Sequence, residues 1–214
     1  CSGGNVAEMR DRTGMFGGSP AQIAANYRAG IQRIPRAFQT LQVPIIAAVN
    51  GAAIGAGNDL ACMCDIRIAA DTARFAESFV KVGIVPGDGG CWLLPRVVGW
   101  SKAAELALTG DTIDAAEALR IGLVSQVVPA GQLLEAAMAL GQRIAANPPQ
   151  VLRWTKQLLQ EGRNSTLDQA LDSAGQFQGL AHHTADHAEA VSAFFEKRAP
   201  VFGNDSASQP GAAV

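Results

Sequence analysis

The sequence has little charge, few aromatic rings and no long uninterrupted apolar run. Charged residues make up 17% and aromatic residues 6% of its 214 positions, and the formal net charge is −2. This near-equal number of positive and negative charges argues against a broad basic surface for nucleic acid or a polybasic membrane face. The most apolar stretch, 43–57, is broken by Pro44, Asn50 and several glycines. It is therefore too short and too interrupted to span a bilayer.

Cysteine is also scarce, and its spacing matches no metal or redox motif. None of the four cysteines forms a CxxC pair, which favours a reducing, cytosolic compartment. They are Cys1, Cys62, Cys64 and Cys91. His183 and His187 stand four residues apart, but no cysteine or carboxylate motif accompanies them beyond Asp186. We therefore expect no metal site.

The chain does contain a hydrophobic fraction of 48% and 23 glycines. Its length suits one domain, or one and a half, with a real core. Strand-like runs, glycine turns and short helices fill 1–130, whereas 131–202 is almost wholly helical. This order predicts an α/β core with an appended helical arm. The small, polar residues of 203–214 are expected to form a disordered tail.

Proline and a capping residue predict the first long helix. Ser19 is a suitable N-cap, and Pro20 follows it at the first helical position. Apolar residues then recur at helical spacing to about Leu41. Pro35 is expected to kink this helix or split it in two.

A glycine-rich turn follows a predicted strand and opens a second helix. The branched apolar run 43–49 predicts a strand buried on both faces, 51–57 a tight turn, and 58–64 a short helix. Free N–H groups at such a helix start can stabilise negative charge that develops on a substrate oxygen. Asp59, just inside the helix, is either an acid–base group beside this oxyanion site or a partner of the helix dipole.

Nucleotide-binding interpretations of the same turn are weaker. A dinucleotide fingerprint requires a third glycine where Leu60 stands, although Asp71 after the next strand would suit the ribose. A phosphate-binding loop requires a Gly-Lys-Ser/Thr sequence, which this turn lacks. The oxyanion interpretation is therefore favoured.

Two other glycine segments are candidate sites. Ser2-Gly3-Gly4-Asn5 precedes a short helix, and its glycines leave backbone N–H groups unobstructed. The turn 87–90 opens another helix. Its Asp88 is either the helix N-cap or a second active-site carboxylate, and the pattern alone favours the cap.

Taken together, these segments resemble the crotonase superfamily, the enoyl-CoA hydratases and isomerases. The matching motifs are C-S-G-G-N-V, A-A-V-N-G-A-A-I-G-A-G-N-D-L-A-C-M-C-D, F-A-E-S-F-V-K-V-G-I-V-P-G-D-G-G and A-L-R-I-G-L-V-S-Q-V-V-P. The resemblance extends over nearly the whole chain, to Phe-Phe-Glu-Lys-Arg at 194–198. It implies an α/β spiral of β-β-α units with a helical C-terminal trimerisation arm. The chain also opens without Met, so the resemblance implies that the family's opening strands and first helix are missing.

The resemblance also implies roles for particular residues. Family members polarise an acyl-CoA thioester carbonyl with two backbone N–H groups, which fall here on Gly4 and Ala56. The first catalytic carboxylate falls on Asp59, where hydratases usually carry glutamate. The second glutamate falls on Phe79, which is a departure from the family pattern. Asp88 in the next glycine turn is the candidate replacement.

Neighbouring residues complete the implied site. Glu77 lies two positions before Phe79, but on a strand it would sit roughly 7 Å away, too far for a simple replacement. Lys197 resembles a basic residue that meets the CoA phosphates, often from a neighbouring subunit. The residues expected to contact substrate are Ser2, Gly3, Gly55, Phe79, Gly87 and Lys197.

The sequence therefore predicts an enoyl-CoA hydratase that acts on a 2-enoyl-CoA thioester. We expect no cofactor beyond the CoA of the substrate, no nucleic-acid or membrane partner, a homotrimer or hexamer, and a cytoplasmic location. Within the family, the alternative is a double-bond isomerase with a single aspartate base. Outside it, the alternative is a non-catalytic CoA-binding or scaffold protein.

Overall fold

The computed structural model describes residues 1–203, which form two compact units. The first unit is Cys1–Leu41 with Ile45–Ala139, and the second is Gln42–Pro44 with the chain from Leu140 onward. The division between them falls inside helix α8 (Leu133–Ala145). The domains expected at 1–130 and 131–202 remain a prediction. Apart from Gly203, the predicted tail 203–214 lies outside the described residues.

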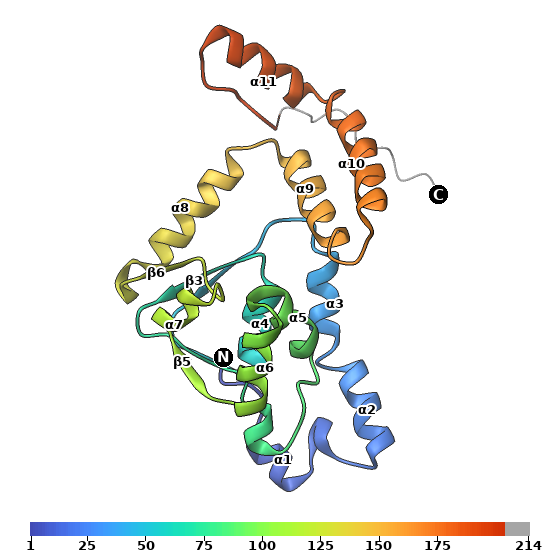
Figure 1. Cartoon of the computed structure of the whole chain (residues 1–214), viewed down its shortest axis with the longest axis vertical. Coiled ribbons are helices and arrows are strands. Elements are labelled where there is room, and N and C mark those ends of the chain that lie inside the picture. The colour runs from blue at the N-terminus through green and yellow to red at the C-terminus, as the bar shows by residue number, and fades with distance from the viewer. Residues whose placement is uncertain (204–214) are drawn as a thin grey trace. The chain divides into compact units, whose positions relative to one another are not determined.

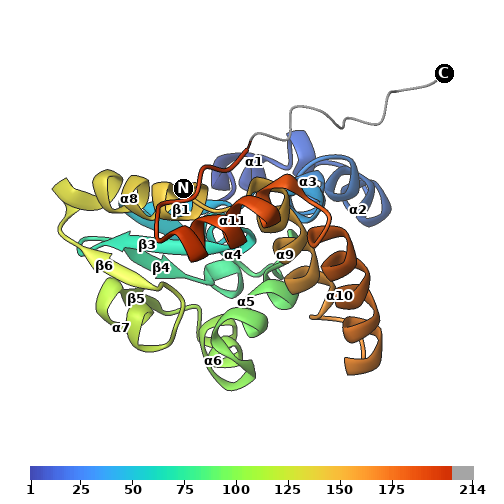
Figure 2. The same cartoon turned by 90° about the horizontal axis from the view of Figure 1, so that it is seen from above.

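The strands of the first unit pair into two sheets (Figures 1 and 2). One sheet has the order β1-β3-β6 and is parallel throughout. The other has the order β2-β4-β5, with β2 and β4 parallel and β5 antiparallel to β4. The strands are β1 (Ile46–Val49), β2 (Ala52–Ile54), β3 (Ile66–Ala70), β4 (Arg74–Ala76), β5 (Thr112–Asp114) and β6 (Gln126–Val128).

The chain order of these strands produces two successive β-β-α units. The first is β1-β2-α4 (Ala56–Met63), and the second is β3-β4-α5 (Gly90–Val98). The first strand of each unit joins one sheet and the second strand joins the other. This arrangement is the spiral of β-β-α units that the sequence predicted.

Two expectations about this region were wrong in detail. The turn predicted over 51–57 contains β2, which pairs with β4 through Ala53 and Phe75. Strand β1 is shorter than 43–49 and is not buried on both faces, because Ala48 is exposed. In the described sheet β1 is an edge strand, paired on one side with β3.

The long helix expected from Pro20 to Leu41 is split, but not at Pro35. Helix α2 (Pro20–Ala29) ends where the N–H of Gly30 bonds the carbonyl of Asn26, and α3 (Arg33–Thr40) begins after Gln32. Pro35 lies in the first turn of α3, where a missing N–H breaks no intrahelical bond. The break therefore falls on the glycine.

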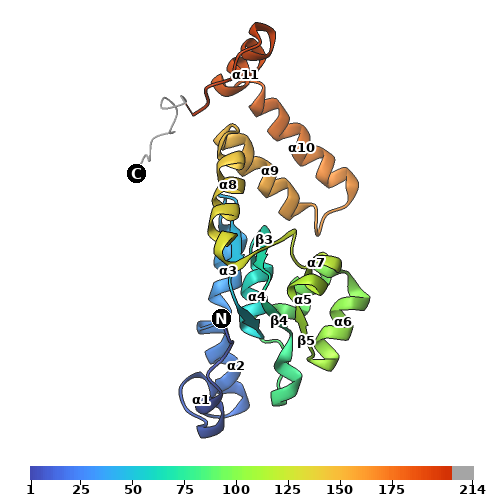
Figure 3. The ribbon, with the colours of Figure 1, turned by 90° about the vertical axis from the view of Figure 1, so that its left-hand side faces the viewer.

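The core of the first unit lies between α4, α5, α6 (Trp100–Thr109) and the second sheet. Helix α4 packs against β2 and α5, and α5 packs against α6 (Figure 3). The largest buried apolar side chains are Phe75, Leu93, Leu94, Leu106, Leu123 and Val124. Packing in this core holds the first turns of α4 and α5 close together, and the candidate site is built around them.

Further α-helices flank these elements. Helix α1 (Val6–Asp11) is capped by Asn5, and α7 (Ala115–Arg120) follows β5. The second unit contains α9 (Pro149–Glu161), α10 (Leu167–Ala181) and α11 (Ala185–Glu196). No helix within residues 1–203 is long and apolar enough to cross a membrane.

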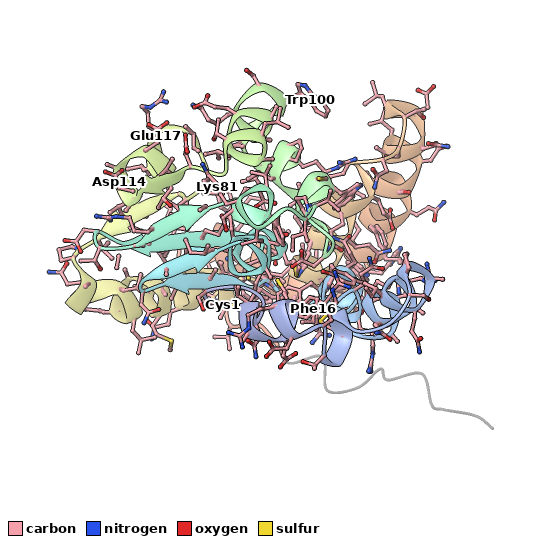
Figure 4. The ribbon with its side chains drawn as sticks, turned by 90° about the horizontal axis from the view of Figure 1, so that it is seen from below. Cys1, Phe16, Lys81, Trp100, Asp114 and Glu117 are labelled. Atoms are coloured by element: carbon pink, nitrogen blue, oxygen red, sulfur yellow. The ribbon has the colours of Figure 1, made fainter. Side chains whose placement is uncertain are left out.

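The cap of α7 gives a test of this fold. The Asp114 carboxylate accepts a hydrogen bond from the Glu117 N–H at 2.8 Å, and both residues are labelled in Figure 4. Asp114→Ala should lower the free energy of unfolding by about 1 kcal/mol in urea denaturation, because the cap is lost. The control is Asp111→Ala, which removes only an exposed pair with Lys81 and should change it by less than about 0.5 kcal/mol. Equal losses would contradict the cap assignment.

Candidate active site

The first residues of the chain lie directly against the turn between β2 and α4. The nitrogen of Cys1 donates to the carbonyl of Ala52 at 2.8 Å, and the N–H of Ile54 donates to the carbonyl of Cys1 at 3.0 Å. A side chain at Gly57 would place its Cβ 2.0 Å from the Cys1 carbonyl oxygen. Glycine is therefore required at position 57 for the two segments to meet this closely.

The turn itself directs a helix start toward this junction. Gly55 has φ 55° and ψ −118°, a conformation that residues with side chains rarely adopt. Ala56 is the first residue of α4, so its N–H has no partner within the helix. A Cβ on Gly3 would lie 3.6 Å from the Ala56 nitrogen. The segment 2–4, which contains the predicted donor Gly4, thus lies beside the other predicted donor, Ala56.

A cavity of about 110 Å³ opens at this junction and collects most of the predicted site residues. Met9 of α1 and Tyr27 and Ile31 near α2 supply part of its largely apolar wall. The predicted residues that line it are Ser2, Gly3, Gly4, Gly55, Ala56, Phe79 and Asp88. The Phe79 ring packs on the turn, since a Cβ on Gly55 would lie 3.6 Å from its Cζ.

Three predicted residues lie elsewhere. Asp59 sits one turn into α4 and is fully buried, so it does not line the cavity. Gly87 precedes Asp88, and a Cβ there would approach the Tyr27 ring to 2.4 Å. Lys197 is exposed in the second unit, where it ends α11 in a left-handed conformation. A role for Lys197 toward CoA stays a prediction.

Asp88 is not the cap of α5, which was the interpretation that the pattern alone favoured. The N-cap of α5 is Gly89, at φ 118°, and it makes no side-chain cap bond. Asp88 is 3% exposed, and its Oδ1 has no hydrogen-bond partner within residues 1–203. A buried carboxylate oxygen without a donor is costly, so its retention needs a reason other than capping.

A second buried carboxyl group, Glu77, accompanies Asp59. Glu77 is 1% exposed, and its Oε2 accepts a hydrogen bond from Asn58 Nδ2 at 2.9 Å. Both carboxyl groups lie against Gly90 at the start of α5. A Cβ on Gly90 would lie 2.2 Å from Glu77 Oε1 and 2.4 Å from Asp59 Oδ1. Gly90 therefore leaves the space in which the two carboxyl groups sit.

The sequence interpretation missed Glu77 because it assumed a continuing strand. Strand β4 ends at Ala76, and Glu77 has φ −93° and ψ 64° before the short 3-10 turn Ser78–Val82. This turn breaks the alternation of a strand, so residues 77 and 79 are not on one face. Glu77 faces Asp59, whereas Phe79 faces the cavity. The acidic residue within F-A-E-S-F, two positions before Phe79, was the available signal.

Burial controls the protonation of this cluster. Burial raises the pKa of Asp59, and the charges and hydrogen bonds of Glu77 and Asp88 raise it further. Burial also raises the pKa of Glu77, although hydrogen bonds from Asn58 and Asp59 partly oppose the rise. Desolvation and a neighbouring carboxylate both disfavour ionisation. These effects favour the protonated form of Asp59 well above the usual pKa range of an aspartate.

These carboxyl groups do not form a metal centre. Across residues 1–203, no group of three or more His, Cys, Asp and Glu residues is placed to hold a metal ion. Of the candidate histidines, His182 and His187 hydrogen-bond each other at 3.0 Å within the second unit. The arrangement around the cavity thus offers backbone N–H donors and carboxyl groups for proton transfer.

Comparison with known proteins agrees with this arrangement. A family model described as enoyl-CoA hydratase/isomerase matches residues 1–205. A Mycobacterium bovis protein named as a probable enoyl-CoA hydratase, echA8, is 45% identical over 94% of this chain and 75% of its own length. The 1,2-epoxyphenylacetyl-CoA isomerase of Escherichia coli K12 is 38% identical over 94% of this chain and 76% of its own.

A solved structure gives the same result for the fold. The crystal structure of enoyl-CoA hydratase from Bacillus anthracis superposes with a TM-score of 0.86 at 35% identity, covering 94% of this chain and 76% of that one. The chain belongs to the enoyl-CoA hydratase/isomerase family.

Proposed function

We propose that this enzyme adds water across the double bond of a 2-enoyl-CoA thioester. The observation that carries the proposal is the single cavity that Gly4, Ala56 and Asp88 line together. Donors and a carboxyl group around one small cavity are what such a reaction requires. The names of the relatives support the same substrate class.

The proposed role of the backbone donors follows from where charge develops. Attack of water on C3 moves electrons through the enoyl system onto the thioester oxygen. The N–H groups of Gly4 and Ala56 would donate to that oxygen. They are fixed by the fold before substrate binds, and preorganised donors of this kind supply large transition-state stabilisation. A flexible side-chain cation would first have to be ordered.

The proposed roles of the carboxyl groups follow from burial and position. Asp88 lines the cavity and is placed to accept a proton from the attacking water. The water oxygen bonds C3, and C2 takes a proton that originates on Asp59 and reaches the cavity by way of the Asp88 carboxyl group, since Asp59 itself does not line the cavity. Afterwards Asp88 holds the proton from water and returns it to Asp59. The proton from water replaces the one that Asp59 gave up, so the cycle closes without an outside proton, and the charge of Asp88, which raises the pKa of Asp59, favours this return.

Double-bond isomerisation is the second candidate, and Phe79 favours it. The ring occupies the position of the family's second glutamate and lies over Gly55. An apolar ring there limits water on that side of the cavity. Moving a proton between C2 and C4 requires one base and the same oxyanion donors. We therefore propose a slow hydratase with measurable isomerisation.

We further propose that the chain works in the cytoplasm as a homotrimer or hexamer. All four cysteines are free, which fits a reducing compartment. The helices of the second unit expose large apolar side chains, as expected of an arm that packs on neighbouring subunits. These are Leu159, Leu167, Leu171, Leu180, Phe194 and Phe195. Lys197 is proposed to meet CoA phosphates.

Removal of one backbone donor tests the oxyanion site. Ala56→Pro deletes the N–H at a first helical position, where proline is well tolerated. We expect turnover of a short 2-enoyl-CoA to fall by about 100-fold or more. Gly51→Ala is the control, since its added Cβ would meet nothing within 4 Å. Near-normal turnover in folded Ala56→Pro, checked by circular dichroism, would refute the assignment.

The role of Asp88 is tested by removing its charge. Asp88→Asn keeps the shape of the side chain but cannot accept a proton, so hydration should fall by about 100-fold. The exposed Asp111→Asn serves as the matched control. Phe79→Glu should raise hydration relative to isomerisation if the missing carboxylate limits the rate. If Asp88→Asn leaves both reactions unchanged, the two-carboxylate mechanism is wrong.

Assembly is tested by sedimentation equilibrium. The chain should sediment as a trimer or hexamer at micromolar concentration. Phe194→Asp, at a 78% exposed position, should shift it toward smaller species, because a charge would be buried in the contact. The neighbouring Glu196→Gln should not. A stable monomer for the unmodified chain would contradict the proposal.

A further inference from the structure

Glu77 is a buried acid that the proposed mechanism does not use. One of its oxygens receives the Asn58 amide, and the other faces Asp59 across the space left by Gly90. With both acids ionised, three of their oxygens have no hydrogen-bond partner within the described chain. They are the two oxygens of Asp59 and Oε1 of Glu77. A proton between the two acids satisfies this contact, because one carboxyl group then donates to the other.

Within residues 1–203, no cation is among the groups that shift the pKa of Asp59 or Glu77. Asp88 adds a third acid from the loop before α5, and Cys62 on α4 is held neutral because burial raises its pKa to about 12. The charge of the Arg67 guanidinium, on β3, acts on the Cys62 thiol and lowers its pKa. The same guanidinium donates hydrogen bonds to the carbonyls of Leu123 and Cys64.

The remaining side of Glu77 is apolar. Glu77 lines a second cavity of about 190 Å³ between α5 and α6, whose walls include Leu94, Trp100 and Ala103. Within this lining, Cys91 is the one other ionisable residue. A bare pair of carboxylates in this environment would be strongly unfavourable.

We infer that Glu77 is a positioning residue that accepts a hydrogen bond from protonated Asp59 and so keeps the catalytic proton there. The Asn58 amide favours charge on Glu77, which decides the direction of the bond: Glu77 is the acceptor and Asp59 the donor. Asp59 is thereby held in the acid form that the proposed hydration requires. This inference rests on the proposed function for its kinetic consequence but not for the proton itself.

Substitutions at position 77 separate this role from simple packing. In Glu77→Gln, the Gln carbonyl would accept from Asn58 and its NH₂ would face Asp59, replacing an acceptor by a donor. Glu77→Met removes the charge without adding a donor. Both variants should let Asp59 ionise at lower pH. Glu77→Asp keeps a carboxylate and should restore the proton, and Glu117→Gln, at a half-buried surface position, is the matched control.

The proton is detected directly by infrared spectroscopy. At pH 8 the unmodified chain should show the carbonyl band of a buried protonated carboxylic acid, and Asp59→Asn should remove it. Glu77→Gln and Glu77→Met should weaken the band, whereas Glu77→Asp and Glu117→Gln should retain it. Absence of the band from the unmodified chain, or an unchanged band in folded Glu77→Gln, would overturn the inference.

The pH profile of kcat/KM for hydration supplies the functional test. In Glu77→Gln the alkaline limb should move to lower pH, with at least about a 10-fold loss at pH 8 and a smaller loss at pH 6. A purely structural role would lower activity equally at every pH, which would overturn the inference. If neither the unmodified chain nor any variant turns over an enoyl-CoA, the proposed function fails. The infrared result would still decide where the proton lies.

Discussion

The contact between the first residues of the chain and the β2–α4 turn is the constraint on which the site depends. It requires a glycine at 57, where any side chain would strike the Cys1 carbonyl. It also requires Gly55 in a conformation that other residues rarely adopt. Only with both in place do Gly4 and Ala56 border the same cavity. The proposed oxyanion donors are thus brought together by tertiary packing, although each glycine is visible in the sequence.

Gly90 imposes a similar constraint on the acids. Helix α5 starts there without a side chain, and the space is filled by the carboxyl groups of Asp59 and Glu77. Burying acids without a cation would destabilise the fold if they were ionised. A shared proton removes most of that cost, and the apolar core between α4, α5 and α6 holds the groups together. The same burial that makes the cluster costly gives it acid–base chemistry near neutral pH.

Local patterns predicted most of the fold but not the details that depend on neighbouring segments. The glycine turns, the helices that they open and the residues around the cavity follow from spacing and from the family resemblance. The position of Glu77 does not, because a strand pattern gives no sign that β4 stops at Ala76. The interpretation of Asp88 as a cap failed for a related reason. Capping depends on which residue takes the boundary conformation, and that residue is Gly89.

The arrangement of the acids explains why hydration and isomerisation are close alternatives on this fold. Both reactions place negative charge on the thioester oxygen, so both use the same backbone donors. They differ in how many protons move at once: isomerisation returns one proton to another carbon, whereas hydration takes a proton from water and gives one to C2. Asp88 lines the cavity, whereas Asp59 and Glu77 are buried together against Gly90, and the charge of Asp88 raises the pKa of both. Such a cluster can supply either pattern, and Phe79, on the Gly55 side, limits how easily water enters. Under the proposed mechanism, the balance between the two activities would therefore be set by the access of water rather than by the oxyanion site.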